Sequence, residues 1–149
     1  MKKLLLVVVT LSLLGIAGHA VNAQVTDTIV ADIPFDFTVR NTTLPAGKYT
    51  IKSLGPILEG TMEIRNEDSH KAIFFLAESA QAKEGPAHSE LIFDRVGNQY
   101  FLSEIFETGD RLGAQVAKTR AEKRLEKEGA VIEIHSVTVP AENAVNARN

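Results

Sequence analysis

Residues 91–106 read LIFDRVGNQYFLSEIF, and this stretch decides the fold. Residues 91–96 and 99–106 are strand-like runs, and Gly97-Asn98 stands between them. Two residues of this type between such runs predict a tight hairpin turn, because glycine and asparagine tolerate a positive φ. We therefore expect a central pair of antiparallel strands.

Alternation of apolar and polar residues predicts further strands before this hairpin. Residues 33–40 and 48–53 both alternate with a period of two, which is typical of a strand with one solvated face. Pro34 cannot donate a backbone hydrogen bond, so we expect it at an edge, a bulge or a strand start. Residues 57–65 predict a third, less regular strand.

Residues 72–77 read AIFFLA and are apolar on both faces, as are parts of the central hairpin. Such runs predict either a sheet covered on both sides or a second face that holds a ligand or partner. A packed sheet or helix is the simpler explanation. A last strand is expected within residues 130–139, with Val131 or Ile132 and also Ile134 pointing inward.

One helix is predicted near the C-terminus. Thr119 and Glu122 have the spacing of a capping box, and Gly129 is placed to end the helix, which covers about residues 120–128. The only apolar stripe of this helix is Ala121 and Leu125, so we expect it to lie on the surface of the sheet.

The predicted fold class is therefore all-β and mainly antiparallel. We expect a meander sandwich or small barrel of about seven to eight strands in sequence order, with one short peripheral C-terminal helix. Residues 24–139 form a single β domain in this interpretation, and residues 140–149 form a disordered tail. The chain has no cysteine, so the domain depends on its hydrophobic core.

Residues 1–23 predict a cleavable signal peptide. Lys2 and Lys3 precede a short apolar run, and Val21 and Ala23 are the small residues expected before a signal-peptidase cut. We therefore expect an exported protein, periplasmic or extracellular, with no stable membrane insertion after cleavage. The remaining 14 basic and 19 acidic residues argue against a general nucleic-acid binder.

Residues 33–39 (IPFDFTV) and 44–51 (LPAGKYTI) resemble the opening of a group of small secreted proteins common in acidobacteria. The group shares a central strand pair like residues 91–106 and a short charged helix like the one that begins at Thr119. This resemblance covers most of the chain after residue 23, and it implies a source and a compartment but no mechanism. Residues 44–51 are also similar to hairpins of bacterial immunoglobulin-like and prealbumin-like modules, which implies a β-hairpin here.

Two His and two Glu residues have a spacing that permits a metal site. His88 and Glu90 lie two apart, as do Glu133 and His135, so each pair shares a strand face. If the two strands adjoined, the four side chains could hold a divalent metal. Exposed polar strand residues are the more common origin of such pairs. Nucleophilic catalysis has no support, because cysteine and the Gly-x-Ser-x-Gly motif are absent.

Carboxylates offer the other candidate chemistry. Asp94 and Glu104 flank the central turn, and Glu104 is expected to share a face with Tyr100, Leu102 and Phe106 and to be partly buried. A salt bridge to Arg95 or another basic group is the simpler expectation for Glu104. The remaining carboxylates considered for paired-carboxylate hydrolysis are Asp36 and Glu90.

The predicted helix is rich in cations. Their default interpretation is a solvated face, and the alternative is a docking strip for an acidic glycan or a lipid head group. The cations on the helix are Arg120, Lys123, Arg124 and Lys127, with Arg111 and Lys118 upstream.

The sequence favours an exported non-enzymatic binding or interaction protein, with a protein or a glycan as candidate partner and no expected cofactor, metal or catalytic residue. The candidate ligand-binding residues lie on the two-faced central strands: Phe75, Tyr100, Phe101 and Glu104. One alternative is a small carboxylate-based hydrolase that uses Glu104 or Asp94. Another is a lipocalin-like carrier of an apolar ligand.

Overall fold

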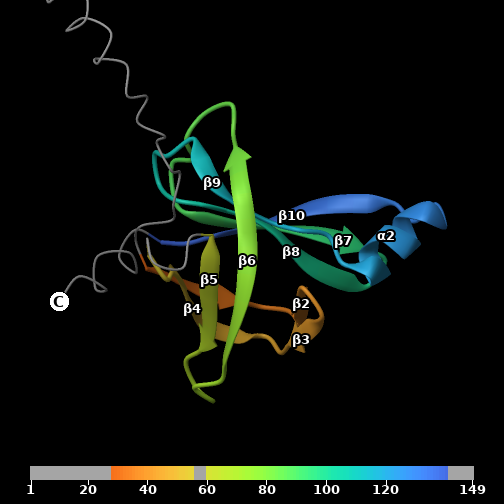
Figure 1. Cartoon of the computed structure of the whole chain (residues 1–149), viewed down its shortest axis with the longest axis horizontal. Coiled ribbons are helices and arrows are strands. Elements are labelled where there is room, and N and C mark those ends of the chain that lie inside the picture. The colour runs from red at the N-terminus through yellow and green to blue at the C-terminus, as the bar shows by residue number, and fades with distance from the viewer. Residues whose placement is uncertain (1–27, 56–59, 141–149) are drawn as a thin grey trace, which may run out of the picture.

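The computed structural model describes residues 28–55 and 60–140, and it contains ten strands and one short helix in this part of the chain (Figure 1). The expected all-β, mainly antiparallel fold with a C-terminal helix is confirmed. The expected signal peptide (1–23) lies outside the described residues, as does the expected tail apart from its first residue, Pro140.

The elements follow one another along the chain. They are β1 (Ile29–Ile33), β2 (Phe37–Val39), β3 (Thr42–Leu44), β4 (Gly47–Ser53), β5 (Thr61–Asn66), β6 (Ala72–Gln81), β7 (Glu90–Val96), β8 (Gln99–Phe106), β9 (Leu112–Val116), α2 (Arg120–Lys127) and β10 (Ile132–Thr138).

The strands do not follow sequence order in the sheet. Their order is β1-β4-β5-β6-β9-β8-β2-β3, and β7 lies between β8 and β10. Every pair is antiparallel except β2 and β8, which run parallel. The expected meander of seven to eight strands is therefore wrong in its order and in its count. The sheet is not closed, so an open barrel or a sandwich describes it.

Pro34 is one physical reason for this difference. The strand expected over residues 33–40 is broken between Ile33 and Phe37. Because proline has no N–H to continue a ladder, β1 ends before it and pairs with β4, while β2 crosses to β8.

The central hairpin is confirmed. Val96 pairs with Gln99 across the two-residue turn, and Gly97 has a φ of 63°. A β-bulge interrupts the pairing, because Ile92 faces Glu104 whereas Phe93 faces Leu102, which leaves Ser103 as the extra residue.

The bulge changes which side chains share a face. Leu102 belongs to the core and Tyr100 packs against it, whereas Glu104 pairs with Ile92 on the outer face of the sheet. The expectation that Glu104 shares a face with Tyr100 and Leu102 is therefore wrong, because one inserted residue reverses the alternation. Only Phe106 remains on its face, two residues after it.

Residues 44–51 do not form the expected hairpin. Strand β3 pairs with β2, whereas β4 pairs with β1 and β5, so the turn carries the chain from one part of the sheet to another. The Tyr49 hydroxyl donates to the Pro45 carbonyl (2.7 Å), and the Ala46 N–H donates to Asp36 Oδ1 (2.9 Å). These bonds give the Ala46 N–H and the Pro45 carbonyl their partners, although β3 and β4 do not pair with each other.

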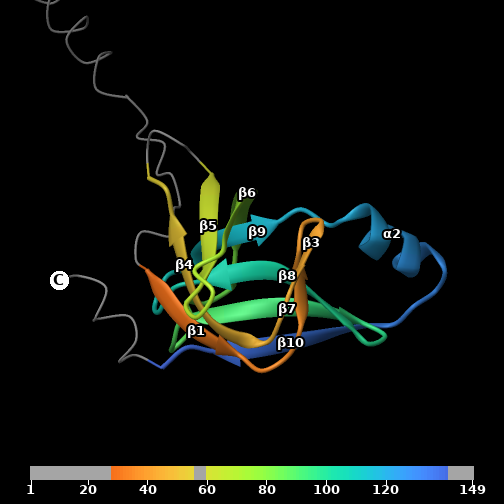
Figure 2. The ribbon, with the colours of Figure 1, turned by 90° about the horizontal axis from the view of Figure 1, so that it is seen from below.

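The core lies between two groups of strands that cross each other, β4-β5-β6 and β7-β8-β10 (Figures 1 and 2). Aromatic rings join the groups: Phe37 meets Tyr49 and Phe93 edge-on, with ring centroids 5.2 and 5.5 Å apart. Phe35 meets Phe93 in the same manner. A filled interior of this kind is what a cysteine-free domain requires.

The second face of β6 is uncovered among the described residues. Phe75 is buried in the core, but Phe74 and Leu76 are 61% and 66% exposed. The same holds at β10, where Val131, Ile132 and Ile134 are exposed, so the expectation that they point inward is wrong. Ile134 pairs with Asp94 on the outer face, and Val137 is the residue that packs against the core.

Two phenylalanines provide a matched test of this core. Phe93→Ala removes a fully buried ring and should lower the free energy of unfolding by about 3–5 kcal/mol. Phe74→Ala removes an exposed ring and should change it by less than about 0.5 kcal/mol. Urea denaturation followed by circular dichroism measures both, and equal losses would contradict the assignment of faces.

Candidate functional site

Helix α2 lies at one end of the molecule and contacts β7 (Figure 2). Its capping box is present as expected: the Thr119 hydroxyl accepts from the Glu122 N–H (3.0 Å), and the Glu122 carboxylate accepts from the Thr119 N–H (3.1 Å). Gly129 follows in the left-handed region with φ 83°. The expected apolar stripe is wrong at Ala121, which is exposed, because the helix buries Glu122 instead.

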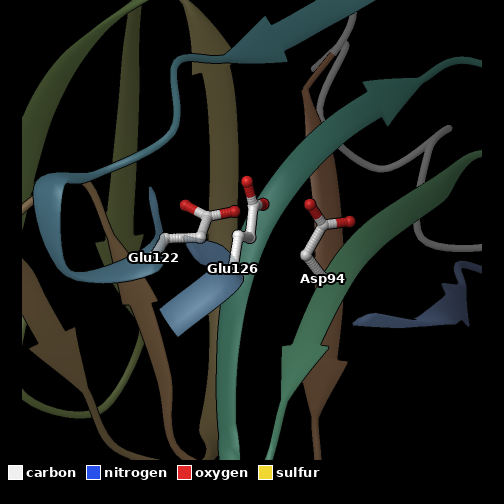
Figure 3. Close-up of side chains that lie close together, drawn as sticks. All are labelled: Asp94, Glu122 and Glu126. Carbon is white, nitrogen blue, oxygen red and sulfur yellow. The ribbon is translucent and has the colours of Figure 1, made fainter. Parts of the chain in front are cut away.

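Three carboxylates converge beneath this helix. Asp94 comes from β7, and Glu122 and Glu126 come from successive turns of α2 (Figure 3). One oxygen from each lies within 4.8 Å of the others, and Glu122 is only 3% exposed. Oxygen ligands at such distances are the type that a hard divalent cation takes.

Lys118 supplies the positive charge for this cluster. Its Nζ lies 3.3 Å from Asp94 Oδ2, and it also forms an ion pair with Glu126. The hydrogen bond to Glu126 raises the pKa of Lys118, so the ammonium stays charged. Burial raises the pKa of Glu122, and the neighbouring Asp94 carboxylate acts in the same direction. The four side chains form one network, in which a single ammonium group neighbours three carboxyl groups.

Glu104 lies further along the same outer face. Burial raises its pKa, and the negative charges of Asp94 and Glu90 raise it further. The expected salt bridge to Arg95 is wrong: Arg95 pairs with Glu133 (2.9 Å), and no ion pair among the described residues involves Glu104.

The four residues proposed from the sequence do not come together. Phe75 and Tyr100 lie on the core side, where Tyr100 stacks on Phe35 with ring centroids 4.0 Å apart. Phe101 is buried on the opposite face of β8, and Glu104 lies on that face beyond the bulge. Only Phe101 lines a surface hollow described below.

The two His–Glu pairs also stay apart, although β7 and β10 are neighbours as that hypothesis requires. The register sets Glu90 opposite Thr138 and His135 opposite Phe93. Glu90 therefore lies on the outer face, where its carboxylate accepts a hydrogen bond from Ser136 (2.9 Å). His135 lies on the other face, with its ring beside Phe35 and Tyr100.

A groove runs between the β2–β3 hairpin and α2, and we call it the helix groove. It consists of three hollows. The first, of about 460 Å³, shares Arg40, Asn41 and Thr119 with a second of about 260 Å³. It shares only Arg120 with a third of about 320 Å³, which is lined by residues of α2 alone. The other lining residues are Thr38, Thr43, Gln99, Phe101, Lys118, Ala121, Lys123, Arg124 and Lys127.

The cations of the helix groove are largely uncompensated. Lys118 is held by carboxylates and Arg124 lies 3.9 Å from Glu128. In contrast, Arg40, Arg120, Lys123 and Lys127 have no carboxylate partner in the described part of the chain. A chain with more acidic than basic residues thus gathers unpaired positive charge at one end.

Arg40 is the groove residue that sequence reasoning missed. It occupies the turn between β2 and β3 with φ 56°, a conformation that glycine or asparagine adopts more readily. Its guanidinium donates to the Ala117 carbonyl (3.2 Å), which brings the turn and the start of α2 together. The helix cations were visible in the sequence, but this contact spans 77 residues and no local pattern predicts it.

No protein-family model, no curated protein and no solved structure matches this chain. Among the described residues, no helix is long and apolar enough to cross a membrane. The chemistry of the site is therefore inferred from its geometry alone.

Removal of Lys118 tests the network that it forms with the three carboxyl groups. Lys118→Met leaves three close carboxylates without their cation and should lower the free energy of unfolding at pH 8. The expected loss is about 1–2 kcal/mol, less than for a fully buried pair, because the Lys118 side chain is 37% exposed. Lys123→Met on the same helix removes an unpaired cation and should cost less than about 0.5 kcal/mol. Similar losses in urea denaturation would contradict the network.

Glu122 should make stability depend on pH. Because its pKa is raised above 4.5 in the folded protein, the folded state binds the proton more tightly than the unfolded state does. This contribution to stability is fully present below pH 4.5 and is lost as the pH rises through the raised pKa.

Glu122→Gln keeps the capping box and removes this titration. The variant should be more stable than the parent at pH 8, and its free energy of unfolding should fall less between pH 5 and pH 8. Glu128→Gln, an exposed change on the same helix, is the control and should leave the pH dependence unaltered. Denaturant unfolding at several pH values measures both, and a profile unchanged by Glu122→Gln would refute the assignment.

Proposed function

We propose that this protein is an exported, non-enzymatic binding protein whose helix groove binds an acidic glycan. Export is inferred from residues 1–23, which have the pattern of a signal peptide. The observation that carries the binding function is the row of cations without carboxylate partners along a groove that also has neutral polar side chains in its lining.

The cations suit a ligand with repeated carboxylates. Arg40 and Arg120 line the same hollow from opposite elements, and a guanidinium can hold a carboxylate through two parallel hydrogen bonds. Lys123 and Lys127 continue the positive charge along α2 from Arg120. A chain of uronic-acid units presents carboxylates at intervals and can contact several of these cations at once.

The neutral side chains favour a glycan over a simple anion. Thr38, Asn41, Thr43 and Gln99 line the hollow next to Arg40 and offer hydroxyl and amide groups to sugar hydroxyls. A flat lipid surface has less access to groups that lie within a groove than an extended oligosaccharide does.

The backbone of Arg40 adds support. A non-glycine residue in the left-handed region costs about 1 kcal/mol, and such conformations cluster at functional sites. Glycine at this position would relieve the strain but remove the guanidinium. An arginine kept under strain beside other unpaired cations fits a residue that serves binding.

The alternatives have less support. A carboxylate hydrolase is expected to use Glu104 or Asp94. Asp94 is buried and held by Lys118, and Glu104 lines none of the three hollows of the helix groove. A lipocalin-like carrier needs an apolar interior cavity, whereas the rings of Phe35, Phe37 and Phe93 pack against one another between the strand groups.

Isothermal titration calorimetry with an alginate hexasaccharide tests the function, with maltohexaose as the uncharged control. The purified protein should bind the first and not the second, and salt should weaken the binding. Arg40→Gly and Arg120→Gln should each lower the affinity roughly tenfold. The change at Arg40 relieves the backbone strain but also removes the hydrogen bond to the Ala117 carbonyl, so circular dichroism of this variant checks that the fold is retained. Lys71→Gln, the same change of charge at an exposed position outside the groove, should bind like the parent.

Two further arms separate other anions. Vesicles with phosphatidylglycerol and a short DNA duplex are titrated under the same conditions. Binding of vesicles or DNA in place of the oligosaccharide would replace the glycan with that ligand. Absence of binding to every anion would mean that the cations form a solvated face.

A further inference from the structure

Apolar side chains are exposed along β10 more than anywhere else in the described structure. The described residues include five exposed large apolar side chains. Three of them, Val131, Ile132 and Ile134, lie in or next to β10. Val131 and Ile134 are 75% and 77% exposed. An exposed apolar cluster on a small soluble domain indicates an interaction surface.

Strand β10 is also an edge strand. It pairs with β7, and no other strand among residues 28–55 and 60–140 hydrogen-bonds to it. Figure 2 shows β10 at the margin of the sheet, with β7 next to it and β8 beyond β7. Its sequence, IEIHSVT, contains no proline and no lysine, the residues that commonly protect a free edge.

The backbone groups of the free edge can be identified. The Val139 N–H donates to the Ser89 carbonyl (2.8 Å), so Val139 faces β7. Because backbone groups alternate in direction along an antiparallel strand, Glu133, His135 and Val137 also hydrogen-bond toward β7. The N–H and C=O groups of Ile132, Ile134 and Ser136 therefore point away from β7.

We infer that β10 is a dimerisation edge that pairs antiparallel with β10 of a second copy of this chain, about a twofold axis beside Ile134. In this register Ile134 faces Ile134 of the second copy, and Ile132 faces Ser136. These are the residues whose backbone groups point outward, so each pair exchanges two hydrogen bonds. The sheet then continues from β7 and β10 of one copy into β10 and β7 of the other.

Side-chain pairing selects this register. With the axis beside Ile134, Glu133 of each copy faces His135 of the other, and both residues are exposed. Within its own copy Glu133 pairs with Arg95, and the His135 ring lies beside Phe35 and Tyr100. The neighbouring registers that keep the outward N–H and C=O groups matched have their axis beside Glu133 or beside His135. These registers set Glu133 against Glu133, or His135 against His135. Unlike polar pairs across strands are favourable and like charges are unfavourable.

Self-complementarity is the reason to choose a second copy as the occupant. A twofold interface requires that one surface fit itself, and IEIHS does so in its apolar pair, its Glu–His pairs and its hydrogen bonds. The interface is separate from the helix groove, so it does not depend on the proposed glycan binding.

Sedimentation velocity over a range of protein concentrations tests the assembly. The protein should show a concentration-dependent dimer. Ile134→Lys should abolish the dimer, because two ammonium groups would face each other. Ile134→Pro should abolish it as well, because it removes only an outward N–H and leaves the β7 ladder intact. Leu76→Lys, at another exposed apolar position on the sheet, should dimerise like the parent.

The absence of cysteine makes the register directly testable. Ile134→Cys alone should form an intermolecular disulfide under mild oxidation, because facing residues of a hydrogen-bonded pair lie about 5.5 Å apart at Cα. Ile132→Cys and Ser136→Cys should cross-link when mixed, and each alone should do so far more slowly. Leu76→Cys controls for random collision.

A protein that stays monomeric at every concentration would overturn the inference. So would a dimer that Ile134→Lys and Ile134→Pro leave intact, since another surface would then hold the copies together. Cross-linking of Leu76→Cys at the rate of Ile134→Cys would equally reject the β10 edge. Circular dichroism of each variant shows that the fold is retained.

Discussion

Strand β8 is the element on which the rest of this structure depends, because three strands hydrogen-bond to it. Strand β7 pairs along its length, β9 pairs with its last residues, and β2 runs parallel to its first ones. The turn at Gly97-Asn98 sets its register against β7, and the bulge at Ser103 changes that register midway. The bulge lets one strand place Leu102 in the core and both Phe101 and Glu104 on the outer face. The outer face of the hairpin is therefore the place where α2, its carboxylates and the helix groove assemble.

The sequence predicted the local features well, because they depend on residues close together in the chain. The Gly97-Asn98 turn, the Thr119–Glu122 capping box and the left-handed Gly129 each follow from a few neighbouring side chains. The outward faces of β6 and β10 were not predicted, because alternation does not say what lies beyond a strand. Phe74 and Ile134 are apolar and would be expected in a core, yet the strand pairing leaves their side chains exposed.

The candidate site shows the same limit. Local sequence identified the cations of α2, and it identified Asp94 as a carboxylate of interest. It did not show that Lys118 joins Asp94 to Glu126, or that Arg40 contacts Ala117, since both contacts cross between elements. Charge is separated at the end of the molecule: carboxylates gather around Lys118 beneath the helix, and cations without a carboxylate partner line the groove. A periodic pattern in one segment cannot reveal this separation of charge, because both the carboxylate cluster and the cationic groove combine residues from strands and turns far apart in the chain.

The parallel contact between β2 and β8 has a consequence for the order of folding. Phe37 pairs with Tyr100, about 60 residues later, whereas β4, β5 and β6 pair with neighbours along the chain. Contacts between distant segments form slowly, because a long loop must close first. During synthesis, β2 and β3 can pair with each other, but β2 lacks its other neighbour, β8, until the central hairpin has emerged. The helix groove is built on β2, β3 and α2, so it is among the last parts of the molecule to take shape.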